Sequence, residues 1–227
     1  MAYEVILLDV DNTLLDFDRC GRYALRKTCE DVGFTYSREL NDKYNAFNDV
    51  LWRSLEKGEI DLATLKEKRF EKLIAHYEID AEPKAMSEYF MGHLGEAVFE
   101  VEGAYELCKK LSGKFTLATM TNGISMVQRG RFKKSRLGAM ISHQFISEEI
   151  GYSKPDPRIF DHALKALGIT DKTKILMVGD SLSSDMKGGY AAGIDTCFFN
   201  PNGLEASVPV TYNIKHLLEL PELLSNQ

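Results

Sequence analysis

The sequence predicts an α/β protein, in which a Rossmann-like parallel sheet is flanked by helices and carries an inserted α-helical domain. Two observations support this fold class. Short apolar runs alternate with helical patterns, an order that implies βαβ units and a parallel sheet. The segment 18–91, which follows the first run, is dense in helix formers and contains no convincing strand.

The first predicted strand, Val5–Leu8, is followed by two carboxylates, Asp9 and Asp11. An apolar run without helical periodicity is typical of a strand buried on both faces of a parallel sheet. Ionised carboxylates at the end of a buried strand are costly unless a cation neutralises them, and hard oxygen ligands suit Mg²⁺. The pattern therefore indicates a divalent-metal site for phosphoryl chemistry. The alternative is that Asp11-Asn12-Thr13 forms only a turn and a helix cap.

Three further runs are predicted as strands: Phe115–Met120, Ile175–Val178 and the weaker Thr196–Phe199. The first two end in the polar clusters Thr121-Asn122-Gly123 and Gly179-Asp180-Ser181. In open α/β sheets, ligands bind outside the carboxyl ends of the strands. We therefore expect the polar residues after three strands to converge on one site.

Helical patterns separate the strands and supply the crossovers that a parallel sheet requires. Two of them end at a glycine, which is a common helix stop. The predicted helices are Ala104–Leu111, Ile124–Leu137, Arg158–Leu167 (ending at Gly168) and Ser184–Ala192 (ending at Gly193).

The segment 18–91 is predicted as a helical cap inserted into a core that consists of residues 1–17 and 92–227. A long excursion between two elements is usually functional, and we expect a lid that excludes water from the strand ends. Its apolar residues recur at helical spacing. They are Leu40, Tyr44, Phe47, Leu51 and Leu55, followed by Leu62, Leu65, Phe70, Leu73, Ile74 and Tyr77.

Asp9 and Asp11 are the candidate catalytic residues, because their i, i+2 spacing lets both project towards one side at the strand end. One carboxylate can attack phosphorus as a nucleophile. The other can give a proton to the leaving alcohol and later take one from water.

Two further segments offer phosphate ligands. Thr121 and the backbone N–H groups of Asn122 and Gly123 can cradle a phosphate at a helix start, although a simple N-cap is the alternative for Thr121. Lys154 lies in Gly-Tyr-Ser-Lys-Pro-Asp-Pro, a loop stiffened by two prolines. There its ammonium either neutralises phosphate and nucleophile or faces solvent.

Asp180 and Asp185 flank Ser-Leu-Ser-Ser after the third strand. Asp180 is expected to bind metal at the strand end. Asp185 either orients Lys154 or caps the following helix. The histidines and cysteines show no spacing typical of a competing metal site.

Taken in order, these motifs resemble the haloacid dehalogenase (HAD) superfamily of Mg²⁺-dependent phosphohydrolases, and the resemblance covers the whole chain. The motifs are Asp9-x-Asp11-x-Thr13, Thr121-Asn122-Gly123, Lys154-Pro-Asp-Pro and Gly179-Asp180-x-x-x-x-Asp185. The resemblance implies that Asp9 forms an aspartyl-phosphate and that Asp11 is the general acid and base. It implies that phosphate is bound by Thr121, Asn122, Gly123 and Lys154.

The same resemblance implies a helical cap between the first two motifs and a bound Mg²⁺. The metal ligands would be Asp9, the backbone carbonyl of Asp11 and the carboxylate of Asp180. Thr13 and Asp185 would support them.

Parts of the cap, together with Thr121-Asn122-Gly123 and Ile146–Gly151, look like the YjjG-type pyrimidine 5′-nucleotidase branch. The cap segments are Asn48–Ile60 and the pair Arg69-Phe70. The likeness implies a nucleotide substrate such as UMP, dUMP or dTMP. The candidate substrate residues are Trp52, Arg53 and Lys57. The alternatives are that Trp52 belongs to the cap core and that Arg53, Lys57 and Arg69 are solvated.

Composition excludes several classes. The 227 residues carry a formal net charge of −6 with a pI near 5.5, which disfavours a nucleic-acid partner held by charge. No secretion signal or apolar run long enough for a membrane span is present, so we expect a cytoplasmic protein with reduced thiols. The expected partner is a small phosphorylated molecule, and the expected state is a monomer or weak dimer.

The expected function is Mg²⁺-dependent hydrolysis of phosphomonoesters, most specifically pyrimidine nucleoside monophosphates. The alternatives are a phosphoglycolate or sugar-phosphate phosphatase, a β-phosphoglucomutase-like mutase and, more remotely, a phospho-accepting signalling domain. A dehalogenase is disfavoured because its chemistry acts on carbon and does not need Asp11. A nicotinamide enzyme is disfavoured because no strand is followed by Gly-x-Gly-x-x-Gly.

Overall fold

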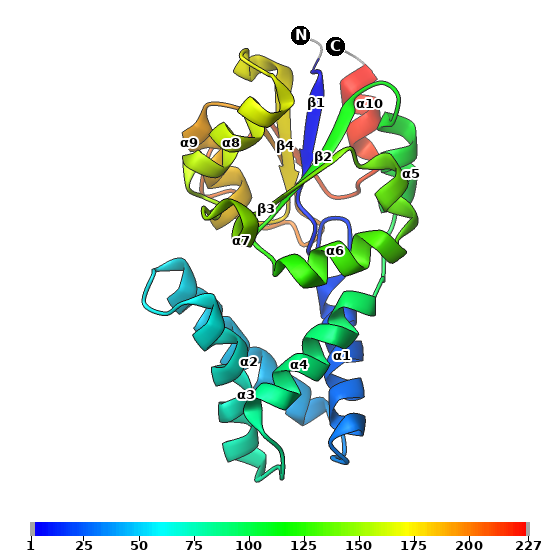
Figure 1. Cartoon of the computed structure of the whole chain (residues 1–227). Coiled ribbons are helices and arrows are strands. Elements are labelled where there is room, and N and C mark those ends of the chain that lie inside the picture. The colour runs from blue at the N-terminus through cyan, green and yellow to red at the C-terminus, as the bar shows by residue number, and fades with distance from the viewer. Residues whose placement is uncertain (1–2, 226–227) are drawn as a thin grey trace. The chain divides into compact units, whose positions relative to one another are not determined.

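The computed structural model describes residues 3–225, which form two compact units. One unit comprises the chain up to Phe17 together with the segment from Val98 onward, and the other is Asp18–Ala97. The first contains a parallel sheet with helices on both faces (Figure 1). This arrangement confirms the predicted α/β fold class.

The sheet has six parallel strands in the order β3-β2-β1-β4-β5-β6. The central strand β1 pairs with β2 on one side and β4 on the other, so Leu8 lies opposite both Thr119 and Val178. The strands are β1 (Val5–Leu8), β2 (Thr116–Thr121), β3 (His143–Ile146), β4 (Ile175–Gly179), β5 (Asp195–Phe199) and β6 (Tyr212–Ile214).

Burial on both faces explains why β1 is apolar throughout. Ile6 and Leu8 pack into the core on one face, and Val5 and Leu7 pack into a separate core on the other. Helices α5 (Ala104–Leu111) and α10 (Glu219–Ser225) contribute to the first core, whereas α8 (Pro157–Leu167) and α9 (Lys187–Ala192) contribute to the second (Figure 1). An alternating pattern appears only where one face of a sheet meets water.

All four predicted strands are present, but β3 and β6 were not predicted. Both lie at the edges of the sheet, where burial is incomplete, and their sequences, His-Gln-Phe-Ile and Tyr-Asn-Ile, form no apolar run. Two predicted helices also differ from the observed ones. The helix predicted to reach Leu137 ends at Lys134, and a 3-10 turn follows it. The helix predicted from Ser184 begins as a π-helical turn over Leu182–Met186 and continues as α9.

The remaining elements of this unit lie between its strands. α6 follows β2 directly, and α7 follows β3. Their bounds are α6 (Ser125–Lys134), η1 (Arg136–Met140), α7 (Ser147–Ile150), η2 (Lys172–Lys174) and η3 (Leu182–Met186).

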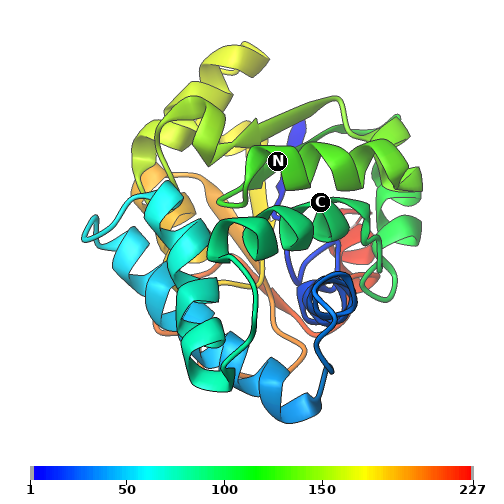
Figure 2. The same ribbon diagram turned by 60° about the horizontal axis from the view of Figure 1, so that its bottom comes forward.

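The second unit contains α1 (Phe17–Asp31), α2 (Arg38–Glu56), α3 (Leu62–Tyr77) and α4 (Pro83–Glu96). Side chains of Ser37 and Asp61 accept hydrogen bonds from the first turns of α2 and α3, which fixes where these helices begin. α2 packs on α3 and α3 packs on α4 (Figure 2). The domain boundary expected between residues 91 and 92 falls inside α4. None of the described helices is both long and apolar enough to cross a membrane.

The expectation that Arg69 is solvated was wrong. Its side chain is buried, with the guanidinium 4.8 Å from the ring centroid of Phe90, and Nη1 donates to Oδ1 of Asn48 at 3.3 Å. Arg69 lies one helical turn from both Leu65 and Leu73, so it occupies the inward stripe of α3. The spacing of Leu65, Arg69 and Leu73 along the helix therefore indicated that Arg69 is buried.

Candidate active site

Asp9 is held at the carboxyl end of β1. Its backbone N–H donates to the carbonyl of Val178 at 2.8 Å, so the strand pairing continues through this residue. The chain then turns sharply, because the N–H groups of Leu14 and Leu15 both donate to the carbonyl of Val10. Asn12 has a φ of 62°, a left-handed conformation that asparagine tolerates well. The turn leaves Asp9 buried, with 9% of its side-chain surface exposed.

Lys154 is buried beside Asp9, so the solvent-facing alternative was wrong. Its Nζ donates to Oδ1 of Asp9 at 2.5 Å, to Oδ1 of Asp185 at 2.6 Å and to the carbonyl of Met120 at 2.8 Å. These three bonds use all three ammonium protons. The backbone of Lys154 is held by the side chain of Asn122, which accepts from its N–H at 2.8 Å and donates to its carbonyl at 2.9 Å.

Asp185 supports the lysine from inside the π-helical turn. It is fully buried, and its second oxygen accepts from the backbone N–H of Ser181 at 3.1 Å. A Cβ at Gly179 would lie 2.3 Å from Oδ2 of Asp185, so a glycine at the end of β4 is what allows this approach. Asp185 therefore both orients Lys154 and braces the turn.

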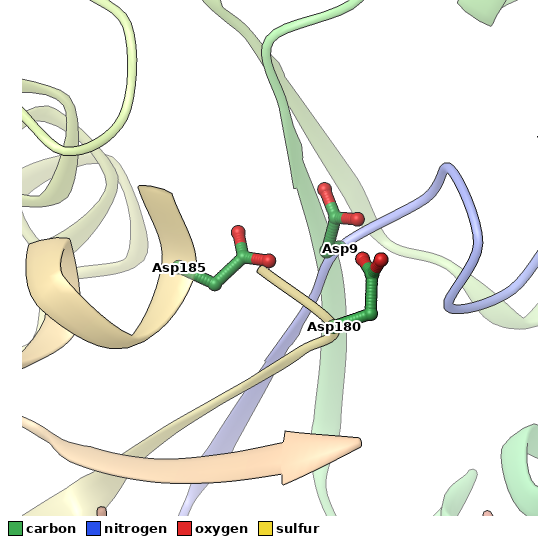
Figure 3. A group of neighbouring side chains, drawn as sticks. All are labelled: Asp9, Asp180 and Asp185. Carbon is green, nitrogen blue, oxygen red and sulfur yellow. The ribbon is translucent and has the colours of Figure 1, made fainter. Parts of the chain in front are cut away.

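Asp9, Asp180 and Asp185 form one acidic cluster. Each offers a carboxylate oxygen, and these oxygens lie within 4.8 Å of one another. Figure 3 shows Asp9 at the end of its strand, Asp180 at the bend after β4 and Asp185 on the neighbouring helical turn, with the Asp185 carboxyl group directed towards Asp9. The Thr13 hydroxyl lies 3.3 Å from Oδ1 of Asp180 and 3.5 Å from Oδ2 of Asp9, between the two carboxylates.

The pKa values in this cluster indicate a shortage of positive charge. Burial and the neighbouring charge of Asp185 raise the pKa of Asp9 well above its usual range, although Lys154 opposes the shift. The same two causes raise the pKa of Asp180 to about 7. Burial lowers the pKa of Lys154, but the charges of Asp185 and Asp9 outweigh it and leave the pKa above its usual value. One ammonium among three carboxylates leaves a donor set that fits a hard divalent cation.

Asp11 contacts different partners from Asp9. Its Oδ2 accepts from Nε2 of Gln128 at 2.8 Å, and its Oδ1 accepts from Nη2 of Arg131 at 2.7 Å. The Asp11 side chain is 26% exposed, whereas that of Arg131 is fully buried. The two candidate catalytic carboxylates are therefore paired with two separate cations.

Thr121 is buried at the end of β2 and linked to the same network. Its Oγ1 accepts from the backbone N–H of Gly123 at 3.0 Å and from Nε2 of Gln128 at 3.1 Å. These bonds leave the hydroxyl proton of Thr121 available to a phosphate oxygen. The N-cap of α6 is Ile124, without a side-chain cap, so the N-cap alternative for Thr121 was wrong.

The structure brings most of the candidate residues of the first unit into two hydrogen-bonded networks. Asp9, Thr13, Lys154, Asp180 and Asp185 form the first, and Asp11 and Thr121 are joined by Gln128 in the second. Trp52, Arg53 and Lys57 belong to α2 and its C-terminal end in the helical unit, where Trp52 is half-buried and the other two are exposed.

Sequence reasoning missed Gln128 and Arg131. Both are almost entirely buried, and Arg131 is the largest fully buried side chain among the described residues. The available signal was their i, i+3 spacing, which places two long polar side chains on one face of the helix that follows Thr121-Asn122-Gly123.

Comparison with known proteins identifies close relatives. The model of the haloacid dehalogenase-like hydrolase family matches residues 3–193. The pyrimidine 5′-nucleotidase YjjG of Escherichia coli is 33% identical over 226 residues, which are 99% of each chain. The pyrimidine 5′-nucleotidase PynA of Streptococcus pneumoniae is 32% identical over 227 residues, which cover 99% of this chain and 96% of the relative.

The HAD-hydrolase YfnB of Bacillus subtilis is similar in both sequence and structure. It is 33% identical over 226 residues, which cover 98% of this chain and 96% of the relative. Its crystal structure, bound to magnesium, matches with a TM-score of 0.91 over 99% of both chains. The fold thus has a counterpart in a relative whose crystal structure is bound to magnesium.

Proposed function

The chain belongs to the haloacid dehalogenase-like hydrolase family and is an enzyme, and from that premise we propose that it hydrolyses phosphomonoesters through a phosphorylated Asp9. We propose pyrimidine nucleoside 5′-monophosphates as the substrate class. Two relatives similar to this chain over nearly their whole length are named pyrimidine 5′-nucleotidases.

The observation that carries the proposal is the different setting of two carboxylates only two residues apart. Asp9 is buried against an ammonium and two further carboxylates, whereas Asp11 is partly exposed and held by an amide and a guanidinium. A nucleophile and a proton carrier need different surroundings. The different surroundings therefore support different roles, with Asp9 as the nucleophile and Asp11 as the proton carrier.

In the first step, a carboxylate oxygen of Asp9 forms a bond to phosphorus while the bond from phosphorus to the substrate oxygen breaks. Asp11 gives a proton to the departing oxygen, so the alcohol leaves neutral. The Thr121 hydroxyl binds a phosphoryl oxygen, and the ammonium of Lys154, which is bonded to Asp9, offsets the charge that builds up next to it.

In the second step, water attacks phosphorus and Asp11 accepts its proton. The bond between phosphorus and Asp9 then breaks, which releases phosphate and restores the carboxylate. Each residue returns to its starting state, so the reaction is catalytic.

The acidic cluster fits Mg²⁺ as the cofactor. Asp9 and Asp180 are the carboxylates we assign as ligands, because the Thr13 hydroxyl lies between them, whereas Asp185 is fully buried and holds Lys154 and the N–H of Ser181. The backbone carbonyl of Asp11 is the third ligand in this proposal, with Thr13 and Asp185 in support. When bound, the ion supplies positive charge that offsets the charges of nucleophile and phosphate and lowers their repulsion.

A phosphate-release screen of the purified protein tests the proposed substrate. It compares UMP, dUMP and dTMP with purine nucleotides, sugar phosphates and phosphoglycolate, each with Mg²⁺ or with EDTA. We expect Mg²⁺-dependent release that favours the pyrimidine nucleotides. A sugar-phosphate or phosphoglycolate preference would contradict the substrate, and release that is undiminished by EDTA would contradict the cofactor.

Asp9→Asn tests the nucleophile. We expect turnover to fall by at least about a thousandfold, because an amide cannot form the acyl phosphate, while thermal stability stays close to that of the wild type. Asp161→Asn is the matched control, since it removes an exposed carboxylate from α8. Comparable activity of both variants would contradict the mechanism.

A mutase and a signalling domain would each give a different result when phosphate release is measured in ¹⁸O-labelled water. A mutase returns the phosphoryl group to a substrate, so free phosphate would take up little ¹⁸O from labelled water. A signalling domain would accept one phosphoryl group and stop. Repeated turnover with one ¹⁸O in each released phosphate is the result expected of a hydrolase.

A further inference from the structure

We infer that Gln128 and Arg131 are positioning residues that fix the carboxylate of Asp11 through both of its oxygens. This inference rests on the proposed function, because it assigns a purpose to holding the proton carrier. It adds two residues of α6 that none of the four motifs contains.

The contacts form a closed network around one carboxylate. Gln128 Nε2 donates to Oδ2 of Asp11 at 2.8 Å, and Arg131 Nη2 donates to Oδ1 at 2.7 Å. The two partners are also joined to each other, since Arg131 Nη2 lies 2.9 Å from Oε1 of Gln128. Two donors on different oxygens fix the plane of a carboxylate, which one donor does not.

The network also sets Asp11 relative to the phosphate-binding residues. Gln128 Nε2 donates to Thr121 Oγ1 at 3.1 Å as well as to Asp11. One amide group therefore spans the proton carrier and the hydroxyl proposed to bind phosphate. A proton donor must lie within hydrogen-bond reach of the departing oxygen, so this link bears directly on the first step.

Gly123 makes room for the amide of Gln128. A Cβ at this position would lie 2.0 Å from Nε2 and 2.9 Å from Cδ of Gln128. The far end of a glutamine usually moves aside at little cost, but this one is bonded to Asp11, Thr121 and Arg131. The absence of a side chain at Gly123 thus leaves the space that the amide of Gln128 occupies.

Packing alone does not account for a charged pair at this place. Burying a guanidinium is costly, and replacing a buried ion pair by apolar residues of similar volume is often neutral or stabilising. Arg131 is fully buried, but the carboxylate it holds is partly open to solvent. The buried guanidinium of Arg131 therefore holds a carboxylate that solvent and substrate can still reach. A positioning residue is expected to do this, because it fixes the reactive group without contacting the substrate itself.

The test uses Gln128→Leu and Arg131→Met, which remove the donors and keep much of the apolar part of each side chain. We expect kcat for dTMP to fall about 10- to 100-fold, with a much smaller change in KM, because general acid–base catalysis contributes about 10²- to 10⁴-fold. Arg131→Lys retains the charge without the planar fork and should recover only part of the loss. Arg129→Met is the matched control, since it removes an exposed arginine of α6 that pairs with Glu149.

A second readout separates positioning from a loss of structure. With 4-nitrophenyl phosphate the leaving phenolate needs no proton, so only the second step depends on Asp11. Both variants should release the first equivalent of phenolate at nearly the wild-type rate and then turn over slowly. Asp11→Asn supplies the reference pattern, and the double variant should lose little more than either single one, because both donors act on one carboxylate.

Three results would contradict either the positioning role or the proposed function, and they can be told apart. Wild-type kcat for dTMP in both variants would overturn the positioning role. An equal loss with dTMP and in the first release of phenolate would assign both residues to structure alone. A wild-type protein that releases phosphate from no phosphomonoester would overturn the proposed function itself.

Discussion

Four aspartates near the ends of β1 and β4 have different properties because they have different neighbours. Asp9 and Asp185 share the ammonium of Lys154, Asp11 is held by Gln128 and Arg131, and Asp180 faces the hydroxyl of Thr13. Residue type alone does not distinguish them. Their proposed roles follow from which cation or donor lies within hydrogen-bond distance.

Asp180 leads to a prediction about pH and magnesium. In the metal-free protein its pKa is raised to about 7, whereas an unfolded chain titrates near the ordinary value of about 3.9. Between these values the folded state binds more protons than the unfolded state, so the contribution of Asp180 to stability falls as pH rises. Mg²⁺ binds the ionised form, so we expect the gain in Tm on adding Mg²⁺ to be larger at pH 7.5 than at pH 5.

Thermal melts of the wild type and Asp180→Asn, with and without Mg²⁺, measure this effect. The variant lacks the titrating group, so its Tm should respond weakly to Mg²⁺ at both pH values. An equal Mg²⁺-induced gain at pH 5 and pH 7.5 in the wild type would contradict the assignment.

At the scale of elements, α9 packs closely against the loop that contains Lys154 and helps to position it. A Cβ at Gly188 would lie 2.7 Å and 2.9 Å from two ring atoms of Phe160 and 3.1 Å from the Cα of Pro155. Pro155 directly follows Lys154, so the approach of α9 also limits where the lysine backbone lies. A small residue here serves both packing and the site.

Gly188→Ala should therefore destabilise the protein by about 1–3 kcal/mol, because neither the ring nor the backbone can move away freely. Gly92→Ala in α4 is the comparison, since a Cβ there meets nothing within 4 Å. It should stabilise the protein by about 0.5–1 kcal/mol, since alanine favours a helix over glycine. Urea unfolding measures both, and a destabilisation of similar size in the two variants would contradict this explanation.

At the scale of the whole molecule, the chain divides into a unit that contains the candidate chemistry and a unit made of helices. We expect substitutions in the helical unit to change which substrate is used rather than how phosphate is transferred. Trp52 on α2 is half-buried and is the residue on which this expectation is best tested.

Trp52→Ala should raise KM for dTMP about tenfold, equivalent to about 1.4 kcal/mol of lost binding, and leave turnover of 4-nitrophenyl phosphate nearly unchanged. Val50→Ala is the matched control, since Val50 is exposed on the same helix. A thermal melt of each variant tests the alternative that Trp52 is needed for the helical core. Loss of both activities together with a lower Tm would favour that alternative.

Much of the site could be predicted because its residues follow apolar runs. Asp9, Thr121 and Asp180 come directly after, or at the end of, β1, β2 and β4, and parallel strands bring such ends together. Gln128 and Arg131 could not be predicted in this way. They lie within a helix, and a helical pattern does not reveal that a polar side chain faces a carboxylate more than a hundred positions away.

Edge strands and buried charges mark the other limits of prediction. β3 and β6 acquire their structure from a neighbouring strand rather than from apolar runs of their own. Arginine side chains are usually solvated, yet Arg69 is buried because it lies between Leu65 and Leu73 on the inward stripe of α3. In both cases tertiary contacts outweigh the preference of the residue.

The sequence by itself determined the α/β class, the family and the order of the motifs, because alternation of apolar runs with helical patterns and the spacing of acidic residues are local properties of the chain. Only the tertiary structure decided the partners: that Lys154 joins Asp9 to Asp185, and that Asp11 is held by Gln128 and Arg131. Hydrogen bonds and ion pairs act over a few ångströms in space. The distance that matters to them is fixed by strand order and helix packing, not by separation along the chain.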